Sequence, residues 1–454
     1  MKKLSIIPIS FLLIASTVLS GCVDELSDNQ TDQNTVPEDL EQRALYITEN
    51  LKNGNYSLVY DVFDETMKSQ LPSSQLKIVW QSLLISNGEL LAIEGAYLTQ
   101  EFGYDIVYVA CNFSEGMLDL RYVFDSEKML AGFQYVDHQD RSSWSSPSYA
   151  NPESFIETNY TFGEEPYIMS GTLTMPSGDG PFPVVLMLSG SGANDRDESI
   201  YQNKPFKDIA WGLGSEDVAT FRFDKRSFLY GEELANDYNA TVEEEYIEDA
   251  QAALNLLETI EGLDSSNIYL LGHSLGAMVA PEIARLDERI KGVILLAAPA
   301  RDLEDTILEQ YTYLYSLDGS ISAQEQADLD SLTQQVDIIN NGSPAFDEVL
   351  LGAYPAYWYK LHEIAPIPIA VNLTQPMLVL QGSRDYQVSP QKDFSLWQQA
   401  FENSTRVTLK LYEALNHLFI AGEGVPTNTE YSKAGHVDEQ VIIDISSWIF
   451  LNDL

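Results

Sequence analysis

The chain has 454 residues, and its 69 acidic side chains outnumber the 25 basic ones to give a formal net charge of −44. A charge of this sign and size excludes a nucleic-acid-binding role and disfavours adhesion to anionic headgroups, because both partners are themselves negative. The two cysteines, Cys22 and Cys111, and the five histidines are dispersed without metal-ligand spacing. We therefore expect no metal site and no cofactor.

The chain begins with a segment typical of export. Residues 1–3 (MKK) are positively charged, residues 4–19 are a short apolar stretch, and residues 19–22 read LSGC. The last four residues resemble the lipobox of prokaryotic lipoproteins, which implies a lipid on Cys22 and a protein tethered to the outer face of the cytoplasmic membrane. An ordinary secretory signal with a stray cysteine is the alternative. Residues 23–40 are polar and acidic and are expected to be a flexible tether.

Residues 41–137 are expected to form a separate α+β unit, because helical stretches come first and strand-like runs follow. The helices are predicted at 41–51, 56–70 and 74–87, and the strands at 91–93, 106–111, 117–124 and 129–135. This unit contains no side chain suited to act as a catalytic base, and His138 lies only at its edge. A Ser-rich linker is predicted at 138–153.

From residue 154 onward, strands alternate with helices, the pattern typical of a parallel, doubly wound sheet. Residues 184–188 (VVLML) are the continuous apolar run expected of a central parallel strand, and the glycine-rich SGSGANDRD follows at 189–197. Further strands are predicted at 219–223, 268–271, 291–298, 377–382 and 407–412, and helices at 206–213, 242–261 and 277–285.

The most informative motif is GHSLG at 272–276, which lies between a predicted strand and a predicted helix. Strand, G-x-S-x-G and helix, in that order, form a nucleophile elbow. Both glycines are required because the serine occupies a sharp turn, in which a neighbouring Cβ would collide with the adjoining strand or helix. We predict that Ser274 is a nucleophile; a chance match to a short pattern is the alternative.

A serine nucleophile needs a base, which follows it in the chain order Ser, Asp or Glu, His. His417 lies just past the strand at 407–412, in a loop from which an imidazole can reach the serine. His417 is therefore the predicted base. His436, near a predicted C-terminal helix, is the second candidate and is otherwise a capping or surface residue.

The orienting acid and the oxyanion hole are each predicted from a loop that follows a strand. Asp385 comes after the strand at 377–382 and is expected to bind the imidazole Nδ1, although a turn-forming role is the alternative. The backbone N–H groups of Ser191, in the glycine-rich loop, and of Leu275, after the nucleophile, are the predicted oxyanion donors. A phosphate-binding loop is the competing interpretation, and the sequence lacks its lysine pattern.

Residues 302–369 form an insertion that is far longer than one crossover helix requires. It is rich in aromatic residues, and we expect a helical cap over the site. The aromatic side chains either line an acyl or alcohol pocket or pack between the cap helices. His362 falls in this insertion and is interpreted as a surface or packing residue.

These segments together resemble the α/β-hydrolase superfamily, and most of all the bacterial and archaeal esterases that carry an N-terminal extension domain. The resemblance covers residues 154–454 and rests on SGSGANDRD (189–197), RFDKR (222–226), GHSLG (272–276), GSRD (382–385) and NH (416–417). The chain departs from the family at Ser189, where many members have His, and at Ser227, where Gly is usual. Asp224, Lys225 and Arg226 are interpreted as structural residues that hold their loop near the site.

The N-terminal unit resembles the uncharacterised extension domain of these esterases, which implies a cone-like fold of the nuclear-transport-factor type. The resemblance rests on NGNY at 53–56 and GF at 132–133. Its role is open between substrate presentation, spacing from the membrane and formation of a homodimer, of which we expect the homodimer.

The resulting hypothesis is a membrane-tethered, extracytoplasmic serine esterase. Ser274 attacks the carbonyl of a small-molecule ester, His417 takes its proton and Asp385 orients the imidazole, after which water releases the acyl group. A peptidase or an acyltransferase with the same triad is an alternative. A non-catalytic surface binding protein is a second alternative.

Overall fold

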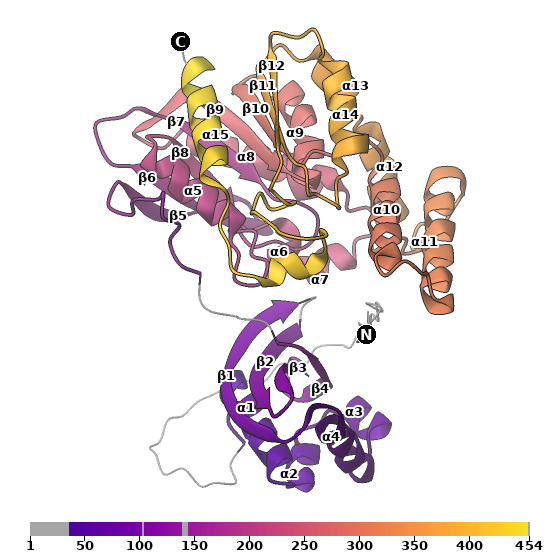
Figure 1. Cartoon of the computed structure of the whole chain (residues 1–454). Coiled ribbons are helices and arrows are strands. Elements are labelled where there is room, and N and C mark those ends of the chain that lie inside the picture. The colour runs from indigo at the N-terminus through magenta and orange to yellow at the C-terminus, as the bar shows by residue number, and fades with distance from the viewer. Residues whose placement is uncertain (1–35, 102–103, 139–143, 453–454) are drawn as a thin grey trace.

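A computed structural model describes residues 36–101, 104–138 and 144–452 of the chain. The predicted signal peptide, Cys22 and most of the predicted tether lie outside these described residues. The described chain forms two units, each with its own sheet, and the smaller one precedes the larger in sequence (Figure 1).

The smaller unit is a four-stranded antiparallel sheet with helices packed on one face (Figure 1). Its helices are α1 (Leu40–Lys52), α2 (Tyr56–Asp61), α3 (Glu65–Gln70) and α4 (Ser73–Asn87). Its strands, in spatial order, are β1 (Leu90–Glu101), β2 (Tyr104–Phe113), β3 (Gly116–Phe124) and β4 (Leu130–Asp137). Ile47, Trp80 and Tyr122 are among the buried residues that join the helices to the sheet. The predicted α+β class is confirmed.

Two elements of this unit differ from the sequence prediction. The helix expected at 56–70 is interrupted because Phe63 forms a β-bridge with Leu130, and Asp64 then caps a new helix by accepting the N–H of Met67 at 2.5 Å. The strand expected at 91–93 is much longer, since β1 pairs with β2 as far as Glu101. Both differences arise from pairing with strands that are distant in sequence, which the local propensities of the residues do not predict.

The larger unit is built on an eight-stranded sheet in the order β12-β11-β10-β9-β7-β8-β6-β5. The strands from β12 to β8 run parallel, while β6 pairs antiparallel with both β8 and β5. The bounds are β5 (Phe155–Glu164), β6 (Tyr167–Pro176), β7 (Phe182–Leu188), β8 (Ala219–Phe223), β9 (Leu263–His273), β10 (Ile290–Leu296), β11 (Met377–Gly382) and β12 (Val407–Tyr412). The predicted doubly wound parallel sheet is therefore confirmed, with an antiparallel hairpin added at one edge.

Helices cover both faces of this sheet, which explains the continuous apolar runs of its central strands. Along β7, Val185 and Met187 face a core shared with α5 (Pro205–Ser215) and α15 (Glu439–Asn452). Val184, Leu186 and Leu188 face the opposite core, shared with α8 (Asp249–Leu257), α9 (Leu275–Leu286) and Trp397 of α14 (Ser395–Ala400). The helix predicted at 242–261 is shorter, and its first turn, Glu243–Glu248, is a π-helix.

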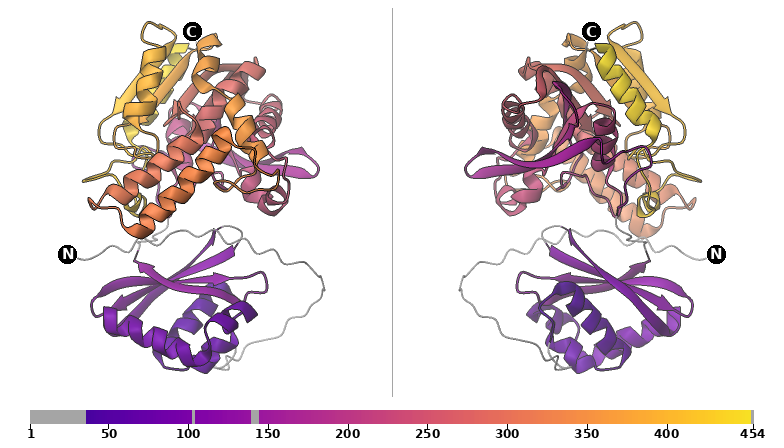
Figure 2. Two further views of the ribbon diagram at one scale, coloured as in Figure 1. Left: turned by 90° about the vertical axis from the view of Figure 1, so that its right-hand side faces the viewer. Right: turned by 90° about the vertical axis from the view of Figure 1, so that its left-hand side faces the viewer.

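The insertion after β10 is helical, as expected for a cap. It contains α10 (Leu303–Ser316), α11 (Ala323–Asn341), α12 (Pro355–Glu363) and α13 (Pro366–Asn372). Helices α10 and α11 lie side by side at one flank of the larger unit (Figures 1 and 2). The remaining short elements are α6 (Arg226–Leu229), α7 (Gly231–Ala235), a π-turn at Pro390–Phe394 and a 3-10 turn at Asn428–Ser432.

The later part of the predicted linker packs against the larger unit. The Trp144 indole donates to Asp208 at 2.8 Å and meets the Trp211 ring edge-on at 4.9 Å. The Tyr149 hydroxyl donates to the carbonyl of Val437 at 2.8 Å. Segment 144–149 of the predicted linker is thus attached to α5 and to the loop before α15.

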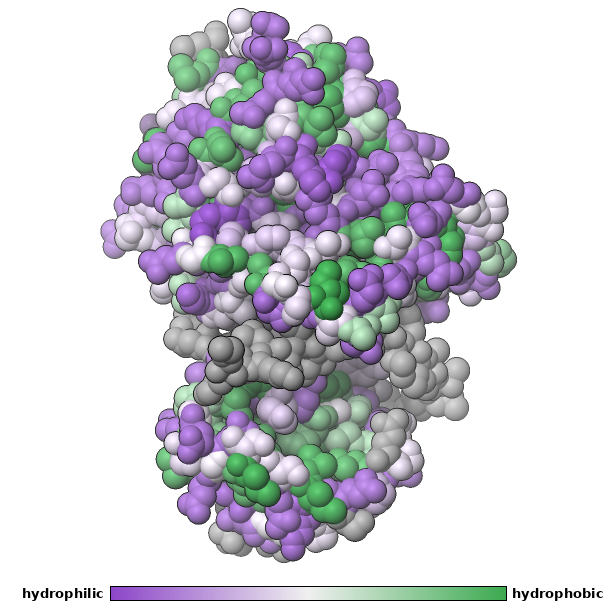
Figure 3. All heavy atoms as spheres, turned by 45° about the vertical axis from the view of Figure 1, so that its right-hand side comes forward, coloured by the Kyte–Doolittle hydropathy of each residue, from purple (hydrophilic) through white to green (hydrophobic). Residues whose placement is uncertain are grey.

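The surfaces of the two units differ in polarity. In Figure 3 hydrophilic residues spread over the visible face of the larger unit, while hydrophobic residues gather on the smaller one. Exposed hydrophobic side chains of the smaller unit include Ile78, Ile85 and Leu91. Within the described residues, none of the helices is both long and apolar enough to cross a membrane.

Candidate active site

Ser274 lies in a strained turn between β9 and α9, at the carboxyl edge of the parallel strands. Its backbone has φ 52° and ψ −119°, values that a residue with a side chain rarely adopts. The Ser274 N–H donates to the carbonyl of Leu296 on β10 at 2.9 Å, which ties the turn to the sheet. An added Cβ would lie 2.3 Å from the Gly276 oxygen at position 272, and 2.4 Å from the Leu188 oxygen at position 276. Both glycines of the motif are therefore sterically required.

Asp385 and His417 form a buried pair near this turn. The His417 Nδ1 and Asp385 Oδ2 atoms are 2.8 Å apart, and the two side chains are 6% and 0% exposed. Asp385 Oδ1 accepts the N–H groups of Gln387 and Val388, each at 2.9 Å, and Oδ2 also accepts from the Gln381 amide at 2.9 Å. Because every lone-pair direction toward the loop is used, the carboxylate has one orientation, with Oδ2 directed to the imidazole.

The residue before Ser274 holds the loop that carries His417. His273 Nε2 donates to the main-chain carbonyl of His417 at 2.9 Å, and the two imidazole rings have centroids 4.6 Å apart. The structure thus brings Ser274, His417 and Asp385 to the same edge of the sheet, at the ends of β9, β12 and β11.

The glycine-rich loop after β7 lies directly against Ser274. A Cβ on Gly190 would stand 3.2 Å from the Ser274 Cβ, so the backbone approaches the serine closely. The Gly190 carbonyl accepts from Lys225 Nζ at 3.0 Å, from the Tyr246 hydroxyl at 2.7 Å and from the Asn194 amide at 3.0 Å.

These bonds also set the direction of the next amide. In a trans peptide the C=O and the following N–H point in opposite directions, so the fixed Gly190 carbonyl turns the Ser191 N–H away from Lys225. Neither the Ser191 N–H nor the Leu275 N–H has an acceptor among the described residues. Leu275 is the first residue of α9, where free N–H groups are expected.

The residues after β8 hold the glycine-rich loop in place through hydrogen bonds and ion pairs. Lys225 is buried, bonds the carbonyls of Gly190 and Gly192 at 3.0 Å each, and pairs with Glu245 at 3.2 Å. Burial lowers the pKa of Lys225, although Glu245 opposes the shift. Asp224 forms an ion pair with Arg196 of the same loop.

Sequence reasoning missed a second buried carboxylate–imidazole pair. Glu198 Oε1 lies 2.9 Å from His273 Nδ1 and accepts the Gly190 N–H at 2.6 Å. Burial opposes the charged imidazole, but Glu198 and the His417 carbonyl outweigh it, so the pKa of His273 is raised. Glu198 and His417 lie 75 and 144 positions from His273 along the chain, so no local sequence pattern marks these contacts.

The other two histidines discussed above lie in separate places. His436 Nδ1 is 3.1 Å from Oδ1 of Asp208, which lies on α5, and the His436 ring meets the Trp144 ring edge-on. His436 is not part of the cluster around Ser274. His362 lies on α12 and bonds Glu304 of α10.

The fold, with a strained serine at the end of its central strand, defines an α/β-hydrolase.

Sequence comparisons with known families and proteins agree with this class. Residues 203–423 match the family model described as "Serine aminopeptidase, S33", and residues 44–133 match that described as "Protein of unknown function (DUF3887)". Esterase EstD of Thermotoga maritima is 38% identical over 411 residues, which are 90% of this chain and 95% of the relative. Esterase FrsA of Klebsiella pneumoniae is 29% identical over 148 residues, 32% of each chain. Among solved structures, Est1E from Butyrivibrio proteoclasticus aligns with a TM-score of 0.42 and 13% identity, over 65% of this chain and 98% of that one.

The similarity to EstD extends over nearly the whole of both chains. The chain therefore belongs to the α/β-hydrolase family of esterases that contains EstD, with the extension domain at its N-terminus.

Proposed function

We propose that the protein is a serine hydrolase of carboxylic esters that works through an acyl-enzyme. The observation that carries the proposal is the strained Ser274 turn at the same sheet edge as the Asp385–His417 pair. Relatives named as esterases support the choice of substrate class. A small-molecule ester is the substrate.

In the proposed mechanism, His417 takes the proton of Ser274 Oγ as the oxygen attacks the ester carbonyl. Asp385, bonded to Nδ1, keeps the proton on that nitrogen and leaves Nε2 free to act as base. The imidazolium then protonates the departing alcohol, and water, activated by the same imidazole, releases the acid from the acyl-enzyme.

The oxyanion of each tetrahedral intermediate is assigned to the N–H groups of Leu275 and Ser191. Neither amide has an acceptor among the described residues, and the Ser191 N–H is directed by the fixed Gly190 carbonyl. Donors that are oriented beforehand stabilise developing charge without reorganisation, which is worth about 10²–10³ in kcat for a single donor in related chemistry.

Ester hydrolysis by the protein and by Ser274→Ala tests the proposal. A series of p-nitrophenyl esters of increasing chain length is the substrate, and Ser320→Ala, a change at an exposed serine between α10 and α11, is the matched control. We expect activity in the wild type and the control, and a loss of at least about 10³-fold in Ser274→Ala. Equal activity in all three proteins would refute Ser274 as nucleophile.

A peptidase is the second candidate function, because the family model that matches residues 203–423 is described as a serine aminopeptidase. The same triad serves both reactions, but an amide leaves as an amine and needs protonation by His417 before the C–N bond breaks. Aminoacyl p-nitroanilides measured beside the esters separate the two. A higher kcat/KM on the anilides than on every ester would favour the peptidase.

We infer further that the protein is an exported lipoprotein held at the outer face of the cytoplasmic membrane through a lipid on Cys22. The sequence of residues 1–22 supports this location. The acidic residues that follow would keep the enzyme in solution beside the membrane, because they are repelled by anionic headgroups.

We also propose that the protein forms a homodimer through the smaller unit. Exposed hydrophobic side chains on α4 support this proposal, since Ile78 is 62% and Ile85 86% exposed. Multi-angle light scattering of the purified chain gives the mass directly. A monomer mass across the micromolar range would contradict the proposal.

A further inference from the structure

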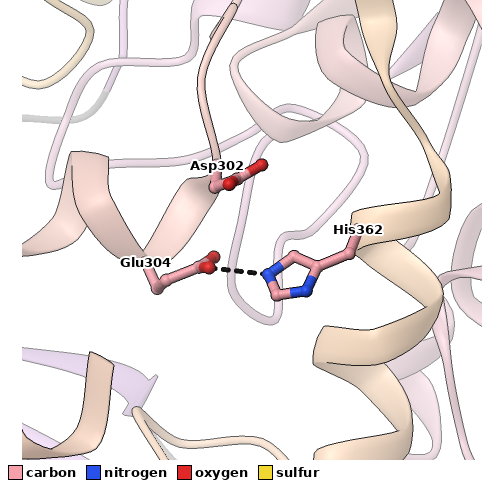
Figure 4. Close-up of side chains that lie close together, drawn as sticks. All are labelled: Asp302, Glu304 and His362. Carbon is pink, nitrogen blue, oxygen red and sulfur yellow. Dashed lines mark hydrogen bonds and ion pairs between the residues drawn. The ribbon is translucent and has the colours of Figure 1, made fainter. Parts of the chain in front are cut away.

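Three potential metal ligands converge at the base of the cap, outside the proposed active site. Asp302 precedes α10, Glu304 lies in its first turn, and His362 lies near the end of α12. One ligand atom from each residue lies within 4.8 Å of the other two. Figure 4 shows the Glu304 carboxylate and the His362 ring facing each other, with Asp302 where the helix begins.

Glu304 is the unusual member of this group. Its side chain is 0% exposed, and its Oε1 atom lies 2.6 Å from His362 Nε2. The second oxygen, Oε2, is buried and has no hydrogen-bond partner in the described structure. A buried carboxylate oxygen without a partner costs free energy, so such an atom requires an explanation.

A second carboxylate–histidine pair shows how such a carboxylate is normally satisfied. In the Asp208–His436 pair the side chains have nearly the same exposure, 0% and 30%, compared with 0% and 29% for Glu304 and His362. Asp208 Oδ1 also accepts from the Trp144 indole, and Oδ2 accepts from the Val437 N–H. Both oxygens of Asp208 therefore have donors, whereas Glu304 Oε2 has none among the described residues, a state it shares with Glu198 Oε2 beside His273.

The Asp302 carboxylate is also available. Asp302 occupies the N-cap position of α10, where an Asp side chain usually accepts a backbone N–H, but it makes no capping bond there. The side chain is exposed, so it can turn toward Glu304 and His362 without disturbing packing.

We propose that Asp302, Glu304 and His362 bind a divalent transition-metal ion of the zinc class. The Glu304 carboxylate, an Asp302 oxygen and His362 Nε2 are the ligands, and water completes the coordination. Metal bonds of about 2.0–2.2 Å from both Glu304 oxygens and from Nε2 replace the hydrogen bond between Oε1 and Nε2. The imidazole selects zinc over Mg²⁺ or Ca²⁺, which take oxygen ligands. The ion gives the orphan oxygen its partner and joins α10 to α12.

This inference is independent of the esterase proposal, because none of the three residues belongs to the Ser274 cluster. The dispersed histidines and the lack of metal-ligand spacing in the sequence predict no metal site. Glu304 and His362 lie 58 positions apart, so no local spacing marks them as a pair. Only the packing of α12 against the start of α10 brings them together.

Isothermal titration of the purified full-length chain with ZnCl₂ at about pH 8 tests the site, because a ligand imidazole must be deprotonated to bind. We compare the wild type with His362→Gln and Asp302→Asn, and use His436→Gln as the matched control. MgCl₂ is titrated in parallel, and melting temperatures are recorded with and without zinc.

We expect one zinc site in the wild type and in His436→Gln, weakened at least about 10-fold in both ligand variants. Zinc should raise the melting temperature of the wild type and of the control more than that of either variant. The proposal is overturned if no single site stands out from weak binding by the acidic surface. It is equally overturned if His362→Gln and His436→Gln bind zinc alike.

Discussion

Asp385 accepts hydrogen bonds from Gln381, Gln387, Val388 and His417, and only the last concerns the proposed chemistry. In Asp385→Asn the new oxygen can keep the two backbone bonds, which leaves the amide nitrogen facing the imidazole. The amide donates to Nδ1, which moves the imidazole proton to Nε2, where it blocks the base. We expect kcat to fall roughly 10³–10⁴-fold with KM little changed, as measured on the best p-nitrophenyl ester. An unchanged kcat, with the melting temperature preserved, would remove Asp385 from the triad.

Glu198 and His273 offer a different test at the residue scale, because their charges couple stability to pH. The two nitrogens of His273 face a carboxylate and a carbonyl, so the doubly protonated ring satisfies both acceptors. The pKa of His273 is raised in the folded state, so its protonation stabilises the fold below the ordinary imidazole pKa of about 6.5. This contribution is lost as the pH rises through the raised value.

Glu198→Gln keeps an oxygen for Gly190 and His273 but removes the charge that raises the His273 pKa. We expect the variant to be less stable than the wild type at about pH 6, and the difference to shrink as the pH increases. Urea unfolding between about pH 5.5 and pH 9 measures the difference. A difference that stays constant over that range would show that the Glu198 charge does not act through His273.

Among the elements of the fold, the central parallel strands were predictable, whereas the edge hairpin was not. Residues 184–188 and 377–382 are continuous apolar runs because both faces of the sheet are covered. Strand β5 is mostly exposed, and its sequence FIETNYTFGE carries no such run. It is a strand because β6 pairs with it along its length.

The same distinction holds at the active site. Ser274, Asp385 and His417 could be proposed from strand ends and chain order, since each lies directly after a recognisable element. The contacts of Glu198, His273 and the buried Lys225 depend on which loops meet in space. Sequence patterns of one chain do not contain that information.

The elbow between β9 and α9 gives a prediction at the scale of elements. In Gly276→Ala the new Cβ would meet the Leu188 and Ser189 carbonyls at 2.4 and 2.7 Å, so β7 and α9 must separate. We expect a loss of melting temperature of roughly 5–10 °C and of nearly all esterase activity. Gly231→Ala is the control, because no atom lies within 4 Å of its added Cβ. Equal melting temperatures for the two variants would contradict the steric argument.

For the molecule as a whole, the proposed lipid on Cys22 and the net charge of −44 act in opposite directions at a membrane. We expect the wild type, expressed in a bacterial host with a radioactive fatty acid, to become labelled and Cys22→Ser to remain unlabelled, because Cys22 is the predicted lipid site. Electrophoresis of the purified proteins measures the label. If the variant carried as much label as the wild type, attachment through Cys22 would be wrong.

The buried Lys225 has a consequence for changing the specificity of this enzyme. Its ammonium group is committed to two carbonyls of the glycine-rich loop, to Tyr246 and to Glu245, so the loop beside Ser274 has little freedom to take new shapes. New substrate preferences are then expected to arise in the cap. Two cap residues also support the site loops, since Gln310 of α10 donates to the Gln387 carbonyl and Tyr357 of α12 donates to Glu245. Directed-evolution libraries for this enzyme should therefore randomise α10 to α13 apart from these two residues, and leave residues 189–198 and 224–226 unchanged.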